Sequence, residues 1–345
     1  MLDIQHPIIC APMGGGPSTP ELVAAVSNAG GLGTLAAAYL SGEQILREIA
    51  RTRALTSQPF AVNLFAGGYD VSRRPDADRA IDLLRPIHQR FGLAAPELPA
   101  LTSDPFPAQL EAVLEARPAV FSFTFGIPGA ADLARLRSRG ILILGTATSV
   151  REAEMLRQAK VDAIIAQGEE AGAHRGTFTE FTNETLVPTL ELVRQIAGIS
   201  PVIASGGMMD GSDIARALSA GAFAAQLGTA FLTCPECGAA PIYKQALLDA
   251  KSDTTVITRA FSGRHARGLR NTFINLTEAA PDAILPYPWQ NALTRPMRTA
   301  AARAADPEYL SLWAGRGVTR CRAMPAAELV GALVSECRAQ RATAR

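Results

Sequence analysis

The segment VDAIIAQGEEAGAHRG, residues 161–176, passes from an apolar run directly into a loop that holds three glycines and one histidine. The apolar part has the length and composition of a buried strand, which we place at 163–167. Glycine allows the backbone to approach a flat ligand closely, and an imidazole that titrates near neutral pH can take or give a proton. Of the four histidines in the chain, His174 therefore has the setting most suited to chemistry.

The same order, a short apolar run followed by an amphipathic helical pattern, recurs through the first 250 residues. We expect strands at 6–13, 32–37, 60–65, 119–125, 141–146, 163–167, 201–205 and 222–227. We expect the helices that follow them at 20–29, 43–55, 130–139, 150–159, 184–196, 212–220 and 241–250. Strands that alternate with helices imply a parallel sheet, and eight such units indicate a closed barrel. The sequence thus predicts the α/β class and a TIM (β/α)8 barrel over residues 1–250.

Two parts of the chain depart from this alternation. Residues 66–118 follow the third strand as an insertion rich in proline and charge, with helices expected near 78–90 and 108–116. Residues 251–345 are expected to form a smaller cap, or substrate region, beside the barrel mouth, together with the C-terminal helices. In this second part we expect a strand at 254–261 and helices at 291–305 and 326–341.

Composition excludes several classes of partner. Apolar residues make up 48% of the 345-residue chain and aromatic residues only 6%, which suits parallel strands covered by helices. A net charge of +1 gives no electrostatic footprint for nucleic acid. No apolar run approaches the ~20 residues that cross a bilayer, and the N-terminus lacks a signal-peptide pattern. With an odd number of cysteines, five, these features predict a cytoplasmic protein with no membrane partner.

Two consecutive strand ends carry glycines, namely Ser205-Gly206-Gly207 and Gln226-Leu227-Gly228-Thr229. They follow the seventh and eighth expected strands, where barrels of this kind often bind a phosphate at a helix N-terminus. The only cationic side chain nearby, Arg216, lies well inside a helix, so backbone N–H groups would have to hold the anion. Either loop alone would favour a simple tight turn. The two together favour a phosphate site.

Other candidate motifs are weaker. The spacing of Cys234 and Cys237 suits redox chemistry or zinc, but no second cysteine pair and no nearby histidine accompany them, so we predict no metal site. The glycines of 29–33 follow a helix and precede a strand, which is the reverse of a dinucleotide fingerprint. His265 lies in a basic loop, either near a ligand or in solvent, and both readings stay open.

These residues together resemble the nitronate monooxygenases, formerly called 2-nitropropane dioxygenases. The element Glu170–Gly176, Glu-Ala-Gly-x-His-x-Gly, is fairly specific to class I of that family. The likeness covers nearly the whole chain. Besides 167–176 and the two glycine loops, it includes Ala11-Pro12-Met13, Phe60–Leu64, Ser122–Gly126, Ala266–Asn271 and Pro286–Leu293.

The resemblance implies a TIM barrel with tightly but non-covalently bound FMN and a small substrate domain. It implies that His174 is the catalytic base and that Met13 lies near the isoalloxazine ring. Positions that match FMN contacts of the family are Asn63, Gln167, Gly172, Gly207, Gln226, Leu227, Gly228 and Thr229. One departure is Ala173, because many relatives have a glycine there, and its methyl group is expected to narrow the pocket.

The implied reaction is oxidative denitrification of an alkyl nitronate, such as propionate 3-nitronate or the anion of a related nitroalkane, by O2. Its products are a carbonyl compound and nitrite. Two alternatives remain open at this point. The same barrel, and the same glycine-rich loop with a histidine (residues 168–176 here, called the histidine loop), occur in FMN-dependent NAD(P)H:quinone reductases and enoyl-thioester reductases. A non-catalytic module that binds flavin or phosphate is the other alternative, although the sequence offers no partner-binding segment for it.

Overall fold

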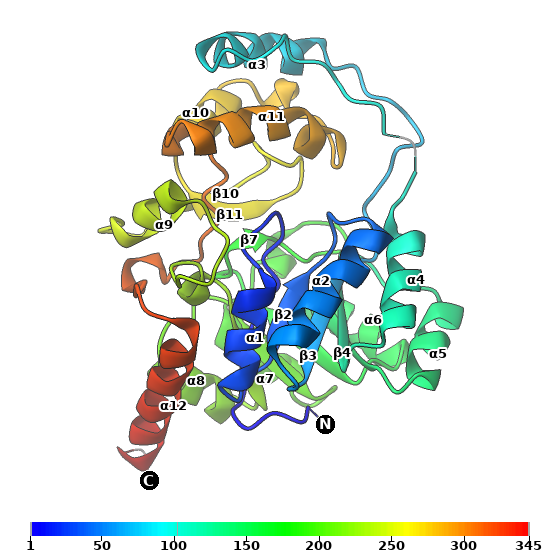
Figure 1. Ribbon diagram of the computed structural model, residues 1–345, viewed down its shortest axis with the longest axis vertical. Coiled ribbons are helices and arrows are strands. Elements are labelled where there is room, and N and C mark those ends of the chain that lie inside the picture. The colour runs from blue at the N-terminus through cyan, green and yellow to red at the C-terminus, as the bar shows by residue number, and fades with distance from the viewer. Residues whose placement is uncertain (1, 102, 344–345) are drawn as a thin grey trace.

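The computed structural model describes residues 2–101 and 103–343 and contains an eight-stranded parallel sheet surrounded by helices (Figure 1). The strand order is β1-β9-β8-β6-β5-β4-β3-β2. The Leu32 N–H donates to the Ile8 carbonyl at 2.9 Å and the Cys10 N–H to the Leu32 carbonyl at 2.9 Å, which closes the sheet. The predicted TIM barrel is therefore confirmed. Its strands are β1 (Ile8–Cys10), β2 (Gly33–Ala36), β3 (Phe60–Phe65), β4 (Val120–Thr124), β5 (Leu142–Ala147), β6 (Ala163–Gln167), β8 (Val202–Ser205) and β9 (Ala224–Leu227).

The barrel has two apolar layers because successive side chains of a strand point to opposite faces. One buried cluster fills the interior, where small residues such as Ala61 and Ala224 make room for Ile165 and Ile203. The alternate side chains form the outer layer under the helices. A filled interior leaves no channel through the barrel, so a ligand must bind at the ends of the strands.

Eight helices cover the outside, but the eighth is not the one that the sequence suggested. The helix expected at 241–250 lies near the cap as α9 (Pro241–Leu248), whereas α12 (Ala326–Thr343) packs against α8 and α1 (Figure 1). The Glu336 carboxylate accepts the Gly211 N–H at 2.8 Å, which joins α12 to the start of α8. The other barrel helices are α1 (Pro20–Asn28), α2 (Gly42–Leu55), α4 (Phe106–Ala116), α5 (Ala130–Ser138), α6 (Val150–Gln158), α7 (Thr189–Ile196) and α8 (Gly211–Ser219).

The insertion divides into a barrel helix, α4, and a long arm that carries α3 (Asp78–Arg90) over the cap (Figure 1). Helix α3 packs against α11 (Trp289–Arg303) and a 3-10 turn at Pro281–Ala283. Ion pairs hold the arm at two points, Arg79 to Asp282 at 2.8 Å and Arg90 to Asp306 at 2.7 Å. The arm thus fastens the cap from the side opposite the barrel.

The cap contains a three-stranded antiparallel sheet of order β10-β11-β7. Strands β10 (Thr255–Thr258) and β11 (Ala266–Leu269) belong to the cap, but β7 (Ala173–His174) is part of the histidine loop. In this pairing His174 lies opposite Ala266. The sequence analysis missed β7, β11 and the helix α10 (Thr272–Glu278), because each is short and β7 pairs only with a distant segment, β11.

The sixth barrel helix, α7, begins later than expected, at Thr189 rather than at residue 184. Pro188 precedes it, and residues 183–185 form a separate 3-10 turn. The Glu170 carboxylate accepts the Thr189 N–H at 2.8 Å, so the histidine loop itself satisfies the start of this helix. None of the described helices combines the length and the apolar character that a membrane span requires.

Candidate active site

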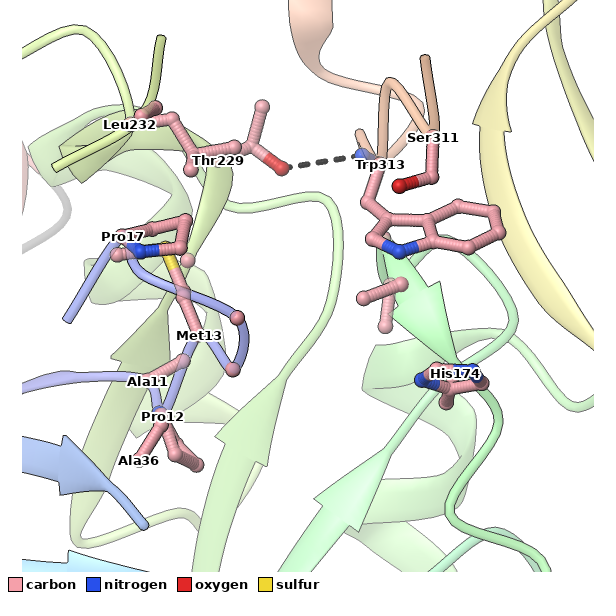
Figure 2. Close-up of a pocket in the computed structure, with 18 of the residues that line it drawn as sticks. Ala11, Pro12, Met13, Pro17, Ala36, His174, Thr229, Leu232, Ser311 and Trp313 are labelled. Carbon is pink, nitrogen blue, oxygen red and sulfur yellow. Dashed lines mark hydrogen bonds between the residues drawn. The ribbon is translucent and has the colours of Figure 1, made fainter. Parts of the chain in front are cut away.

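A cavity of about 530 Å³ lies between the carboxyl ends of the barrel strands and the cap. This volume is within the range of small-molecule and cofactor sites, roughly 300–1,000 Å³. Figure 2 shows His174 and Trp313 on one side of the cavity and Met13 and Pro17 on the other. Every residue that the sequence analysis placed in the site lines this one cavity: Met13, Asn63, Gln167, Gly172, His174, Gly206, Gly207, Gln226, Leu227, Gly228 and Thr229.

His174 lies in β7 with its ring inside an aromatic box. The ring centroids of Phe65, Phe125 and Trp313 lie 6.4, 5.8 and 5.6 Å from that of the imidazole. On the cap side, Nε2 is 2.8 Å from the Ser262 hydroxyl. Nδ1 makes no hydrogen bond to any other residue that the structure describes. One ring nitrogen is therefore held by the protein and the other is left for a ligand.

The imidazole is neutral at physiological pH. Burial lowers the pKa of His174 to about 3, and the positive charges of Arg264 and Arg298 act in the same direction. The Ser262 hydroxyl lies 3.2 Å from the Arg264 carbonyl, so it can donate there while it accepts from His174 Nε2–H. In that tautomer Nδ1 carries a free lone pair. The site thus presents a neutral imidazole nitrogen with a free lone pair to the cavity.

This low pKa predicts a pH dependence of stability. An unfolded chain has a histidine pKa of roughly 6.5, so between about pH 6.5 and pH 3 the unfolded state binds a proton that the folded state does not. The folded protein therefore loses stability as the pH falls through this window. We expect the melting temperature to fall less between pH 7 and pH 4.5 in His174→Asn than in the parent protein, as measured by calorimetry.

The other perturbed histidine is the same in both proteins, which makes this comparison selective. Burial lowers the pKa of His265 to about 4, and its contribution cancels in the difference. An identical pH dependence in the two proteins would contradict the assignment of a low pKa to His174.

Gln167 holds the histidine loop from within. Its Nε2 donates to the His174 carbonyl at 2.9 Å, and its Oε1 accepts the Gly176 N–H at 2.7 Å. The Arg175 side chain adds hydrogen bonds to the carbonyls of Gln167 at 2.8 Å and Thr185 at 3.1 Å. Two side chains thus fix the backbone on both sides of His174.

Two further amide side chains leave acceptors for a ligand. Asn63 Nδ2 donates to the Ser122 hydroxyl at 2.9 Å, and Gln226 Nε2 lies 3.4 Å from the Ser205 hydroxyl. The side-chain oxygens of both amides line the cavity and accept no hydrogen bond from the described residues. Such oxygens suit the N–H groups of a heterocyclic ring.

The loop after β8 depends on glycine. Gly206 and Gly207 have φ values of 134° and 68°, which side chains rarely adopt. A Cβ added at Gly206 would lie 2.6 Å from Thr189 Oγ1, and one at Gly207 would lie 2.8 Å from Glu170 Cβ. Within the described ranges, the N–H groups of Gly206, Gly207 and Gly228 donate to no protein acceptor. These amides can therefore hold an anion.

The start of α8, by contrast, is not an anion site, which corrects one expectation. Asp210 caps the helix, and its oxygen accepts the Asp213 N–H at 2.9 Å. The Asp213 carboxylate accepts the Met209 N–H at 2.8 Å, and Glu336 accepts the Gly211 N–H. Three carboxylates already satisfy this helix terminus and would repel a phosphate. The backbone N–H groups of the glycines in the two loops remain available for an anion, but the N-terminus of α8 does not contribute to such a site.

The remaining predicted residues shape the cavity wall. An added Cβ at Gly172 would lie 2.6 Å from the backbone of Ala314, so the histidine loop packs directly on the segment before Gly315. Thr229 Oγ1 accepts the Gly315 N–H at 3.0 Å, which is the dashed line drawn from Thr229 in Figure 2. Ala173 lines the cavity and adopts a left-handed φ of 61°, a backbone conformation that glycine adopts more readily than alanine.

Sequence reasoning missed the aromatic and cationic parts of the wall. Phe65 and Phe125 come at the ends of β3 and β4, so their place after a strand could have marked them. The other missed residues come from the cap or from the second loop, where no local pattern points to a barrel site. They are Tyr39, Tyr243, Ser262, Asn291, Arg295, Arg298, Arg303 and Trp313.

Two motifs prove to lie outside the cavity wall. His265 stacks on Phe181 with ring centroids 3.7 Å apart and an interplanar angle of 12°. Cys234 and Cys237 form a turn in which burial raises the pKa of both thiols. Over residues 2–101 and 103–343, no group of three or more metal-ligating side chains is placed to hold a metal ion.

Comparison with known proteins agrees with this site. The nitronate monooxygenase family profile matches residues 1–336. A protein of Staphylococcus aureus (strain Newman) named probable nitronate monooxygenase is 38% identical over 339 residues, with 97% of this chain and 95% of the relative covered. Nitroalkane oxidase from Streptomyces ansochromogenes has a solved structure with 40% identity, a TM-score of 0.91 and 99% coverage of both chains.

A second structure is more distant. FabK from Thermotoga maritima shares 27% identity and a TM-score of 0.78, with 100% of this chain and 96% of that chain covered. The family match spans residues 1–336 and confirms the resemblance noted from the motifs. The chain therefore belongs to the nitronate monooxygenase family, a family of flavin-dependent oxidoreductases.

Proposed function

We propose that the protein holds FMN in this cavity and catalyses oxidative denitrification of alkyl nitronates by O2, with a carbonyl compound and nitrite as products. The observation that carries the proposal is the neutral imidazole of His174, which faces a cavity that also contains free backbone amides. The family match supports nitronate chemistry for such a site.

The cavity has the parts that FMN requires. Unpaired N–H groups of Gly206, Gly207 and Gly228 would hold the phosphate. The amide side chains of Asn63 and Gln226 would form hydrogen bonds with the polar edge of the ring. Other cavity-lining residues, among them Met13, Gly172, Leu227 and Thr229, would surround the cofactor. When bound, FMN supplies electron transfer between the nitronate and O2, which no side chain of the protein can supply.

The protein's own residues would bind, orient and deprotonate the substrate. His174 Nδ1 would take the α-proton from a neutral nitroalkane, while Nε2–H donates to Ser262 and keeps the ring in place. The aromatic box of Phe65, Phe125 and Trp313 would exclude water from the charged carbon. A nitronate that arrives already ionised needs no base.

The test is direct. The purified protein should show the visible bands of oxidised flavin, release FMN on denaturation, and form nitrite with O2 consumption when given propionate 3-nitronate. A protein that binds FMN but forms no nitrite from any nitronate would overturn the catalytic part of the proposal.

Reduction of a quinone or an enoyl thioester with NAD(P)H is the second candidate, because reductases of these kinds share the barrel and the histidine loop. Anaerobic mixing with NADH or NADPH separates the two activities. Rapid bleaching of the flavin would favour the reductase, whereas an unchanged spectrum would favour the nitronate reaction. Absence of both nitrite formation and flavin reduction would leave a module that binds flavin without turnover.

A further inference from the structure

The segment of residues 315–322 lies against two of the loops that form the cavity. The Gly315 N–H donates to the Thr229 hydroxyl oxygen in the loop after β9. A Cβ added at Gly317 would lie 2.8 Å from the carbonyl oxygen of Gly207, in the loop after β8. The segment thus packs directly on both loops whose N–H groups are assigned to the phosphate.

Arg320 of this segment holds one peptide of the loop after β8. Its Nη2 donates to the Gly207 carbonyl at 3.1 Å. The Gly207 carbonyl and the Met208 N–H belong to the same trans peptide, so they point in opposite directions. The Met208 N–H has no acceptor among the described residues, and Met208 lines the cavity, whereas Arg320 does not. Arg320 therefore binds the carbonyl edge of this peptide and leaves its N–H edge for a ligand.

Arg322 makes a similar contact with a different result. Its Nη2 donates to the Met209 carbonyl at 3.0 Å. The N–H of the same peptide, that of Asp210, lies 3.4 Å from the Asp213 carboxylate and is therefore already used. Of the two arginines, only Arg320 holds a peptide whose N–H stays free within the described residues.

Arg320 also balances the negative charge next to the loop. Its Nη1 lies 2.7 Å from the Asp210 carboxylate and 2.8 Å from that of Asp213. Asp213 has a second cationic partner, Arg216, but Asp210 pairs with no other cation in the part of the chain that the structure describes. A phosphate monoester carries about 1.5 to 2 negative charges at neutral pH. Without Arg320, the Asp210 carboxylate would be left to repel it.

The contacts of Arg320 add little to the stability of the fold. Its side chain is 43% exposed, and ion pairs of exposed side chains are weakened by water and salt. All three of its partners, however, belong to residues 207–213, which include the loop assigned to the phosphate. The effect of Arg320 should therefore appear in the cofactor site rather than in the melting temperature.

We propose that Arg320 is a positioning residue for the phosphate of the cofactor. It holds the Gly207–Met208 peptide with the N–H group free, which adds a fourth backbone donor to the three glycine N–H groups described above. It also offsets the charge of Asp210. The inference rests on the proposed function for the presence of FMN, but not for the reaction with nitronates. Because riboflavin lacks the phosphate, the role of Arg320 should appear as a difference between two flavins.

The experiment measures the binding of FMN and of riboflavin to the full-length protein after bound flavin has been removed. In Arg320→Met we expect the Kd for FMN to rise roughly fivefold to thirtyfold, because the peptide loses its support and Asp210 loses its cation. For riboflavin we expect a change of no more than about twofold. An equilibrium titration that follows flavin fluorescence gives both constants.

Arg316→Met is the matched control. Arg316 belongs to the same segment and its side chain is 45% exposed, but it pairs with Glu169 of the histidine loop at 2.9 Å. This variant should bind both flavins like the parent protein. Phosphorus NMR of bound FMN follows the surroundings of the phosphate directly. The resonance should move toward that of free FMN in Arg320→Met and stay in place in Arg316→Met.

Two further variants separate the contact with the carbonyl from the charge. Arg320→Lys keeps the charge but lacks the planar fork that reaches a carbonyl and two carboxylates, so its affinity for FMN should lie between those of Arg320→Met and the parent protein. Addition of Asp210→Asn to Arg320→Met removes the uncompensated charge and keeps a good helix cap, and it should recover part of the affinity. No recovery would overturn the charge part of the proposal.

Equal weakening of FMN and riboflavin binding in Arg320→Met, or unchanged FMN binding, would overturn the inference. If Arg320→Met does not fold, Arg320→Lys decides: a loss confined to FMN supports the role, and parallel behaviour of the two flavins removes it. A parent protein that binds FMN but forms no nitrite would contradict the catalytic part of the proposed function and not this inference. A parent protein that binds neither flavin would overturn this inference together with the assignment of the cofactor.

Discussion

Replacement of His174 by asparagine is expected to lower the turnover of neutral nitroalkanes by about a hundredfold to ten-thousandfold, the range attributed to general base catalysis. The neutral imidazole is placed to take the α-proton, and an amide cannot replace it as a base. Preformed nitronates have already lost that proton. Their turnover should therefore stay within a few-fold of the parent protein, because asparagine keeps a polar group of similar size.

The measurement is nitrite release from 1-nitropropane and from propyl-1-nitronate under identical conditions. His265→Asn is the matched control, since that ring stacks on Phe181 outside the cavity wall, and it should affect neither substrate. Equal loss on the nitroalkane and the nitronate would refute the base role and leave His174 as a residue that only shapes the loop.

The second large effect is expected at the glycine loop after β8. Gly206→Ala should abolish stoichiometric FMN binding, because a side chain at φ 134° is strained by roughly 1–3 kcal/mol and its Cβ would lie 2.6 Å from Thr189 Oγ1. The loop can relieve this contact only by moving its N–H groups. Those are the groups assigned to the phosphate.

Gly228→Ala is the matched control in the neighbouring loop. Its φ is −110°, and an added Cβ would meet only Ala11 Cβ at 3.5 Å, an ordinary contact. We expect this variant to retain flavin. The flavin-to-protein absorbance ratio after gel filtration, together with the melting temperature, distinguishes loss of cofactor from loss of fold. Full flavin content in Gly206→Ala would disprove the role of this loop.

Much of the barrel could be predicted because its signals are local. Each strand is a short apolar run bounded by polar residues, and the ends of β6, β8 and β9 carry the glycines that mark the site. Since carboxyl ends of parallel strands meet at one edge, the histidine loop and the loop that begins at Gln226 could be assigned to one site from the sequence, whereas Asn63 was assigned only through the family resemblance.

The cap could not be predicted in the same way because its elements depend on distant partners. Strand β7 has only two residues and exists because β11 pairs with it. Helix α9 follows the eighth strand, as a barrel helix should, yet α12 takes the outer position. Glu336 of α12 accepts the Gly211 N–H at the start of α8, and Glu236 accepts the Ala326 N–H at the start of α12. The arginines of α11 reach the cavity only through this tertiary arrangement.

The ladder between β7 and β11 has a mechanical consequence. His174 is carried by a strand whose neighbour belongs to the cap, and Ser262, which steadies its ring, belongs to the cap as well. A displacement of the cap that separates β11 from β7 would break this pairing and would also remove the Ser262 hydroxyl from the imidazole. The position of the base therefore depends on the position of the cap.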